Sequence, residues 1–292
     1  MDVMIIFQAL AAGVIAGLTC FFPVSSLGCV VLFTHFFDFE ENFFFYEMIL
    51  AGLILASVSF YYKDILRLVI SLLEMIRDLL YNLFITIKPK SKQKTSESRR
   101  ILTNNYRNFT VILLISLIPI LIVGFLGQRL VRFAFENELL ICMGFMLTAL
   151  LLLVSSFMNS GEKSPKKAKT TDALVMGVAE CLSFIPGVSK NAMGISSGFL
   201  LGLSRKFVMK YTYLISMLCM IILIIPGRIS FRYLGGTADP AIMIAAFLGS
   251  ALTGSFMIRA AQKQISRAYN KLYAVLNLAL AMTAACVFLI TT

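Results

Sequence analysis

Two short segments of the chain combine a proline break with hydroxyl side chains. The first runs from Phe21 to Ser26 and reads Phe-Phe-Pro-Val-Ser-Ser, and the second runs from Phe184 to Lys190 and reads Phe-Ile-Pro-Gly-Val-Ser-Lys. Where such a break is followed by a new helix, the first backbone N–H groups have no partner, and together with the helix dipole they attract an anion. The two segments therefore predict a site for a phosphate or diphosphate.

Side chains in these segments provide hydroxyls and one positive charge for that site. The phosphate-binding candidates are Ser25, Ser26, Gly187, Ser189 and Lys190. Lys190 is the most informative of them, since an ammonium inside a membrane is costly and marks a functional site. Glu180, ten residues earlier, can act as an acid or base, pair with Lys190, or be solvated at the membrane surface. The alternative for the serines is that they only cap helices.

The elements that must position these residues are membrane helices. The chain is 59% hydrophobic and 14% charged, with a mean hydropathy of +0.87, whereas a soluble domain is about 25% charged. Six runs can cross roughly 30 Å of hydrocarbon: 43–62, 110–132, 138–158, 208–226, 240–258 and 271–290. The stretches 3–37 and 173–204 are each broken midway, and we predict that they are re-entrant helical hairpins, because such a break needs surrounding protein or a cavity.

The charges orient these elements. The loops 63–109, 161–170 and 259–271 carry ten, four and four basic residues, and they are expected to be cytoplasmic. The acidic turns Asp38–Glu41 and Glu136–Glu138 are then outside. We expect the first hairpin to open outward, with the N-terminus outside, and the second to open to the cytoplasm. The alternative, a single span through 3–37, places the N-terminus inside.

The resulting fold is an all-α polytopic membrane protein with two inverted repeats, 1–160 and 161–292, each with one re-entrant hairpin and three transmembrane helices. Ligand sites in this plan form near the bilayer midplane from broken helices. Within the first repeat, Arg67, Glu74 and Asp78 share a face of the segment 66–82, which predicts an amphipathic helix at the cytoplasmic interface. Residues 88–100 have the composition of a disordered linker.

Composition excludes other kinds of site. The net charge of +11 comes from the basic loops, so no nucleic-acid partner is expected. The six cysteines lie in apolar segments without metal or disulfide spacing. The single histidine, His35, excludes a His-rich metal site, and no metal ligands are predicted.

Longer motifs around both segments resemble a known family. Gly17–Gly28 (GLTxFxPVSSxG) is similar to the first signature of the BacA-type undecaprenyl-diphosphate phosphatases. Ile185–Ser189 (IPGxS) and Leu200–Arg205 (LLGLSR) are similar to their second. The resemblance covers essentially the whole chain. It implies a fold of two inverted halves and removal of the terminal phosphate from undecaprenyl diphosphate at the bacterial inner membrane, which recycles the lipid carrier for peptidoglycan synthesis and confers bacitracin resistance.

The chain departs from the family at the residues that the resemblance makes catalytic. The two glutamates of the first signature are here Ala16 and Cys20, and its histidine is Cys29. In the second signature an arginine is Lys190 and the following serine is Asn191, which we include among the phosphate-binding candidates. Glu180 stands where the family usually has glutamine. A divalent cofactor, Mg²⁺ or Ca²⁺, is implied by the resemblance, but its expected carboxylates are absent.

These departures leave two functional hypotheses. The first is a working phosphatase, with Ser26 as nucleophile and with Ser189 and Lys190 holding phosphate. The second is a relative that binds or flips a polyprenyl phosphate without hydrolysis, because phosphate-binding positions remain while general acid and base groups are missing. A third, an ion or small-solute transporter, lacks a row of charges within the membrane. The partners expected are a polyprenyl phosphate or diphosphate and the membrane, and a homodimer is left open.

Overall fold

The computed structural model describes residues 3–39, 43–87, 102, 104–158, 161–231, 239–264 and 267–291. Apart from one isolated bridge between Lys163 and Leu203, regular structure in these residues is helical. Six of the described helices are long and apolar enough to cross a membrane. The prediction of an all-α polytopic membrane protein is therefore confirmed.

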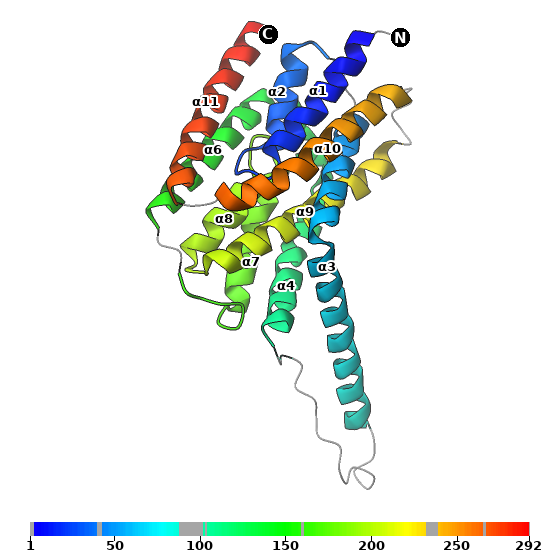
Figure 1. Ribbon diagram of the computed structural model, residues 1–292, viewed down its shortest axis with the longest axis vertical. Helices are drawn as coiled ribbons and strands as arrows, with labels where there is room; N and C mark the ends of the chain where they lie inside the picture. Colours follow the sequence, from blue (N-terminus) through cyan, green and yellow to red (C-terminus); the bar gives the residue numbers. More distant parts are fainter. Residues whose placement is uncertain are drawn as a thin grey trace.

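The first hairpin consists of α1 (Val3–Thr19) and α2 (Ser26–Phe36), with 17 and 11 residues. Each is shorter than the roughly 20 residues that a transmembrane helix needs. The helices pack side by side, and α1 begins at the end of the molecule where α11 (Arg267–Thr291) finishes (Figure 1). At that end the ring of His35, in the last turn of α2, lies 4.9 Å from that of Phe288 in α11. Stretch 3–37 thus enters and leaves at one end, as a hairpin and not as a single span.

The second hairpin consists of α7 (Thr170–Cys181), a short 3₁₀ turn (Leu182–Phe184) and α8 (Lys190–Leu200). Figure 1 shows it below α1 and α2, on the side of the molecule toward which α3 extends. Its tip turns at Gly187, whose φ of +91° favours glycine because a Cβ is disfavoured in that conformation. The two hairpins therefore approach each other from opposite ends.

The segment after the first hairpin differs from the prediction. One helix, α3 (Phe43–Ile87), runs for 45 residues, about 68 Å at 1.5 Å per residue, so the span predicted over 43–62 and the amphipathic segment predicted over 66–82 are parts of one continuous helix. The charged face explains the continuity. The guanidinium of Arg107 in α4 (Asn105–Leu126) lies 2.8 Å from Asp78 and 3.0 Å from Glu74. These carboxylates pack against a neighbouring helix instead of facing the membrane surface. The linker 88–100 lies outside the described residues.

The other predicted spans correspond to helices with shifted ends. The run 110–132 forms α4 and a second helix, α5 (Gln128–Glu136), which are separated at Gly127. The runs from 138, 208, 240 and 271 correspond to α6 (Glu138–Phe157), α9 (Arg205–Phe231), α10 (Pro240–Gln264) and α11. The acidic residues 40–41 and the predicted boundary near 160 fall outside the described part, so the division into repeats stays a prediction.

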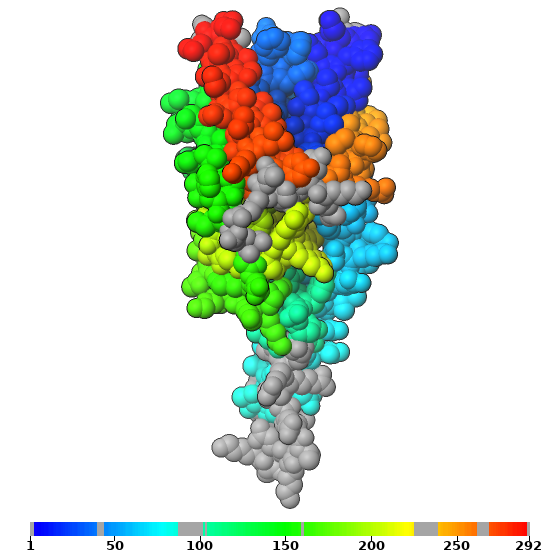
Figure 2. All heavy atoms as spheres, turned by 60° about the vertical axis from the view of Figure 1, so that its left-hand side comes forward, coloured from blue at the N-terminus to red at the C-terminus, as the bar shows by residue number. Residues whose placement is uncertain are grey.

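The packing of the helices relates the first half of the chain to the second. The hairpin helix α1 packs against α10, and its counterpart α7 packs against α4; likewise α3 packs against α10, and α9 against α4. Two further contacts join a helix directly to its own counterpart in the other half: α3 packs against α9, and α6 packs against α11. Figure 2 shows α11, α2 and α1 together at one end of the molecule. Both hairpins therefore pack against helices from the opposite half.

Candidate functional site

The two hairpin tips are joined by one serine side chain. Ser25, which is 3% exposed, precedes the first residue of α2, and its hydroxyl oxygen accepts the Gly28 N–H at 3.2 Å. The same oxygen accepts the Gly187 N–H of the second tip at 3.0 Å. A hydroxyl oxygen has two acceptor lone pairs, and both are used here. Ser25 therefore caps its own helix and binds the other hairpin.

A second connection comes from the opposite direction. The amide nitrogen of Asn191, in the first turn of α8, donates to the carbonyl oxygens of Cys20 at 2.7 Å and Phe22 at 3.3 Å. The backbones also approach closely, because a Cβ on Gly28 would overlap the backbone of Gly187. The tips thus form one packed unit of two broken helices.

Each tip is also held by a polar residue on a long helix from the opposite half of the chain. The Thr148 hydroxyl of α6 lies 3.1 Å from the Gly187 carbonyl oxygen, to which it can donate, and accepts the Ser189 N–H at 3.0 Å. The Asn277 amide of α11 donates to the Pro23 carbonyl oxygen at 2.9 Å. Thr148 and Asn277 are each the eleventh residue of their helix. The motif analysis missed both; the signal available was a polar residue in the middle of an apolar run.

These contacts occupy several of the groups that were predicted to bind phosphate. The N–H groups of Gly187 and Ser189 already have partners, and the Ser189 hydroxyl caps α8 by accepting the Ala192 N–H at 3.3 Å. Ser25, Ser189 and the Asn191 amide nitrogen are used in capping or in joining the hairpins. Of the predicted set, the side chains without such a structural contact are Ser26 and Lys190.

Ser26 and Lys190 are the first residues of α2 and α8, so each lies at a helix N-terminus. Both are buried, with 6% and 8% of their surface exposed. Both lie close enough to Cys20 to influence the ionisation of its thiol. The structure thus places the predicted nucleophile and the predicted cation in the neighbourhood of the same residue, Cys20.

Glu180 lies in the interior, where α7 packs against α8. It is fully buried, and neither carboxylate oxygen has a hydrogen-bond partner. A Cβ on Gly194, one turn beyond Lys190 in α8, would meet its Oε1 at 2.7 Å and the Thr212 hydroxyl at 2.5 Å. Burial excludes the alternative that Glu180 is solvated at a surface. It interacts electrostatically with Lys190 and lies behind that residue.

The divalent cation implied by the family resemblance does not fit the residues of the first hairpin. Ala16, at the position of one expected carboxylate, is completely buried in α1; Cys20 stands at the position of the other, and Cys29 at that of the histidine. Hard divalent cations prefer oxygen ligands, and an alanine supplies none. In the described residues there is also no group of three histidine, cysteine or acidic side chains suited to a metal.

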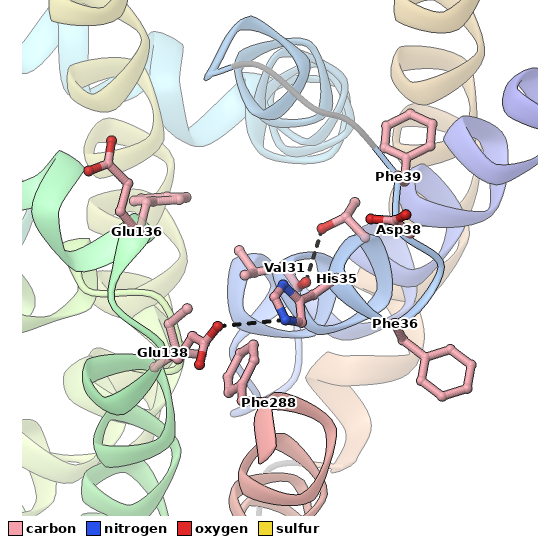
Figure 3. A pocket seen from close by; sticks show the side chains of 11 residues that line it. Val31, His35, Phe36, Asp38, Phe39, Glu136, Glu138 and Phe288 are labelled. Carbon is pink, nitrogen blue, oxygen red and sulfur yellow. Dashed lines mark hydrogen bonds and ion pairs between the residues drawn. The ribbon is translucent and has the colours of Figure 1, made fainter. Parts of the chain in front are cut away.

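A polar cavity of about 610 Å³ lies at the end of the molecule where α2 and α11 finish. Figure 3 shows His35 of α2 directed toward Glu138 of α6, with Phe288 beside them; the two side chains approach to 3.6 Å. Asp38 and Glu136 also line the cavity, while Val31 and Ile141 lie on its apolar side. Ile141 belongs to the turn of α6 that contacts Gly187. The cavity therefore reaches toward the hairpin tips through an acidic opening.

This architecture defines a class of protein: a multi-pass helical membrane protein in which two short, broken hairpins meet inside the bundle. Within that class the chain belongs to the family described as bacitracin resistance protein BacA, whose family model matches residues 9–283.

Curated relatives agree with this family. An undecaprenyl-diphosphatase from Methanosphaera stadtmanae is 26% identical over 261 residues, covering 89% of this chain and 90% of its own. Undecaprenyl-diphosphatases from Alkaliphilus metalliredigens and Korarchaeum cryptofilum are 28% and 27% identical, over 87% and 86% of this chain and 88% and 87% of theirs. This chain is therefore similar to these undecaprenyl-diphosphatases over most of its length.

Proposed function

We propose that the protein acts on the polyprenyl diphosphate or phosphate that carries cell-wall precursors, and that it binds the lipid headgroup at the junction of its two hairpins. The observation that carries the proposal is the placement of Ser26 and Lys190. Both are buried at helix N-termini, next to Cys20, where the two tips join. A helix N-terminus favours a negative charge, and an ammonium neutralises one.

The residues at the junction have different roles in the proposed phosphate site. Lys190 supplies the positive charge, and the N–H groups of the first turns of α2 and α8 supply partial positive charge. Ser25, Asn191, Thr148 and Asn277 fix the two tips relative to each other, which keeps these groups in place before the lipid arrives. In a phosphatase the Ser26 hydroxyl is the group positioned to attack the terminal phosphorus atom. We place the protein in the bacterial inner membrane, with the loops 63–109, 161–170 and 259–271 in the cytoplasm.

One observation favours a second function, binding or flipping of the lipid without hydrolysis. Phosphoryl transfer needs neutralisation of developing charge, and it is aided by a general acid or base. Ala16 and Cys20 provide neither carboxylate at the first hairpin, and Glu180 lies one helical turn behind Lys190. The retained groups support binding of a phosphate more directly than cleavage of a phosphoanhydride.

Phosphate release distinguishes these two functions. Purified protein is incubated with undecaprenyl diphosphate in detergent, with Mg²⁺ or Ca²⁺ present, and inorganic phosphate is measured. Binding of labelled undecaprenyl phosphate and its movement across proteoliposomes are measured in parallel. Release of phosphate establishes the phosphatase, and binding or movement without release establishes the second function.

A matched pair of lysine variants tests the site itself. Lys190→Ala removes the buried cation, and we expect loss of lipid binding of about 10-fold or more, since a charge-assisted hydrogen bond contributes about 1.5–3 kcal/mol. Lys166→Ala removes an exposed lysine from the loop before α7 and is expected to bind as the unaltered protein does. Equal binding by the two variants, or no binding by the unaltered protein, would overturn the proposed site.

A further inference from the structure

The second half of α3 uses only one of its sides within the chain. Figure 1 shows this helix continuing past α4 and α7, away from the hairpins. In this part of α3 three residues spaced seven apart are buried: Ser71, Asp78 and Ile85. Ser71 lies 3.2 Å from the Thr110 hydroxyl of α4, and Asp78 pairs with Arg107 of the same helix. The buried side of the segment therefore packs against α4.

The other side of the segment has an apolar heptad pattern. Six side chains recur at alternating steps of three and four residues, and each is at least 44% exposed: Leu66, Val69, Leu73, Ile76, Leu80 and Leu83. We call these six residues the heptad face. At 3.6 residues per turn it lies on the opposite side of α3 from Ser71 and Asp78. Three heptads with apolar residues at both positions are typical of a coiled coil, in which such side chains insert between those of a second helix.

The heptad face follows the part of α3 that crosses the membrane. The helix is about 68 Å long, whereas the hydrocarbon is about 30 Å thick, so roughly half of the helix lies outside it. Charged side chains mark the point of exit: Lys63, Asp64 and Arg67. Asp64 lies 2.6 Å from Lys210, in the second turn of α9. Because α3 continues from there without a break, the heptad face extends away from the membrane and cannot lie flat on its surface.

An exposed apolar face of this length in water requires a partner. The residues that follow α3, 88–100, contain no large apolar side chain and do not supply one. A second copy of the chain does supply one, because it presents the same face. Copies in one membrane share an orientation, so their α3 helices run parallel, and identical residues leave the membrane at the same height.

We propose that copies of this protein associate through the heptad face, forming a parallel, in-register coiled coil outside the membrane. The two positions of the heptad that face the partner are apolar in all three repeats, as that packing requires. The side of α3 that binds α4 stays where it is, so association needs no change within the chain. This inference is independent of the proposed headgroup site.

Two adjacent cysteine substitutions test the contact in the membrane. Ile76→Cys lies on the heptad face, whereas Met75→Cys lies about 100° around the helix from it. A disulfide requires two Cβ atoms about 4 Å apart, so a parallel, in-register contact joins Ile76→Cys to itself on a second copy. After oxidation of membranes that contain the full-length protein, we expect most of Ile76→Cys to migrate at twice the mass of one chain. Met75→Cys and the unaltered protein, which share the six native cysteines, are expected to remain single.

Co-purification of two differently tagged copies gives a second readout that needs no disulfide. The paired substitution Leu73→Gln and Leu80→Gln replaces two exposed apolar side chains of the heptad face and is expected to abolish co-purification. Leu102→Gln makes the same change at an exposed leucine before α4 and is expected to leave it unchanged. Absence of the cross-link at Ile76→Cys, equal cross-linking at both positions, or cross-linking to a protein of another mass overturns the inference. Co-purification that survives the paired substitution overturns it as well.

Discussion

Replacement of Ser25 by alanine tests whether one hydroxyl holds the two hairpins together. The side chain is buried and accepts the N–H groups of both Gly28 and Gly187. Loss of the helix cap costs about 1 kcal/mol, and leaving the buried Gly187 N–H without a partner costs about 1–3 kcal/mol more. We therefore expect Ser25→Ala to lower the free energy of unfolding by about 2–4 kcal/mol.

Ser189→Ala is the matched control for this experiment. Ser189 begins the corresponding helix of the second hairpin and is equally buried, but its hydroxyl accepts only the Ala192 N–H within its own hairpin. Its replacement is expected to cost about 1 kcal/mol, the contribution of a cap alone. The difference between the two variants therefore isolates the contact between hairpins.

The assay is unfolding in mixed micelles of a mild detergent and dodecyl sulfate, followed by circular dichroism. Lipid binding measured on the folded variants adds a second observable, because a loosened junction is expected to weaken headgroup binding in Ser25→Ala more than in Ser189→Ala. Unfolding free energies for the two variants that agree within about 0.5 kcal/mol, the usual error of additivity, would refute the reasoning.

Four further substitutions test other parts of the structure. Gly187→Ala introduces a Cβ at a φ of +91° and against the backbone of α6, and we expect a loss of about 2–4 kcal/mol in unfolding free energy, measured in the same micelles. Asn277→Leu removes the donor to the tip of the first hairpin and should lower stability by about 1–3 kcal/mol. Arg107→Met removes the closer of the two arginine partners of the buried Asp78 and should lower stability by about 1.5–3 kcal/mol; retained stability would contradict a contribution from this ion pair. Cys20→Glu places a carboxylate beside the cation at the junction, and phosphate release with Mg²⁺ is expected to rise by about 10²-fold if a missing acid or base limits hydrolysis.

The sequence predicted the hairpins well because their signal is local. A proline between two apolar stretches that are each too short to span the membrane fixes both the break and its depth. The ends of α6, predicted at 138 and 158 and observed at Glu138 and Phe157, were clear for a similar reason, since an acidic turn precedes the helix. Helix ends and breaks that depend on a few neighbouring residues could therefore be predicted from the sequence alone.

The continuity of α3 could not be predicted in the same way. Glu74 and Asp78 are typical of an interface when the helix is considered alone, and their true partner, Arg107, lies 33 and 29 residues away along the chain. A charged residue is compatible with a buried face when a distant helix neutralises it. Single-sequence patterns contain no information about that pairing, so they do not predict that the helix continues to Ile87.

The sequence predicted residues of the candidate site and roles for them, but not the contacts that some of them make with each other. Helix starts at Ser26 and Lys190 were anticipated, and with them the helix N-termini that attract an anion. The sequence could not show that the Gly187 N–H is already bonded to Ser25, 162 positions away, or that Glu180 lies behind Lys190 and not beside the junction. These assignments depend on how the two hairpins are docked, which is decided by contacts between the halves.

The tips of the two hairpins are held by equivalent residues, but the hairpins differ in their ionisable side chains. Thr148 and Asn277 hold the tips from equivalent positions of α6 and α11, so the supporting structure treats both hairpins alike. The ionisable groups do not follow this symmetry: the buried cation and the buried carboxyl group, Lys190 and Glu180, both belong to the second hairpin, while the first retains Ser26 next to a thiol. The two hairpins therefore bring different groups to their junction, a hydroxyl from the first and a charged side chain from the second.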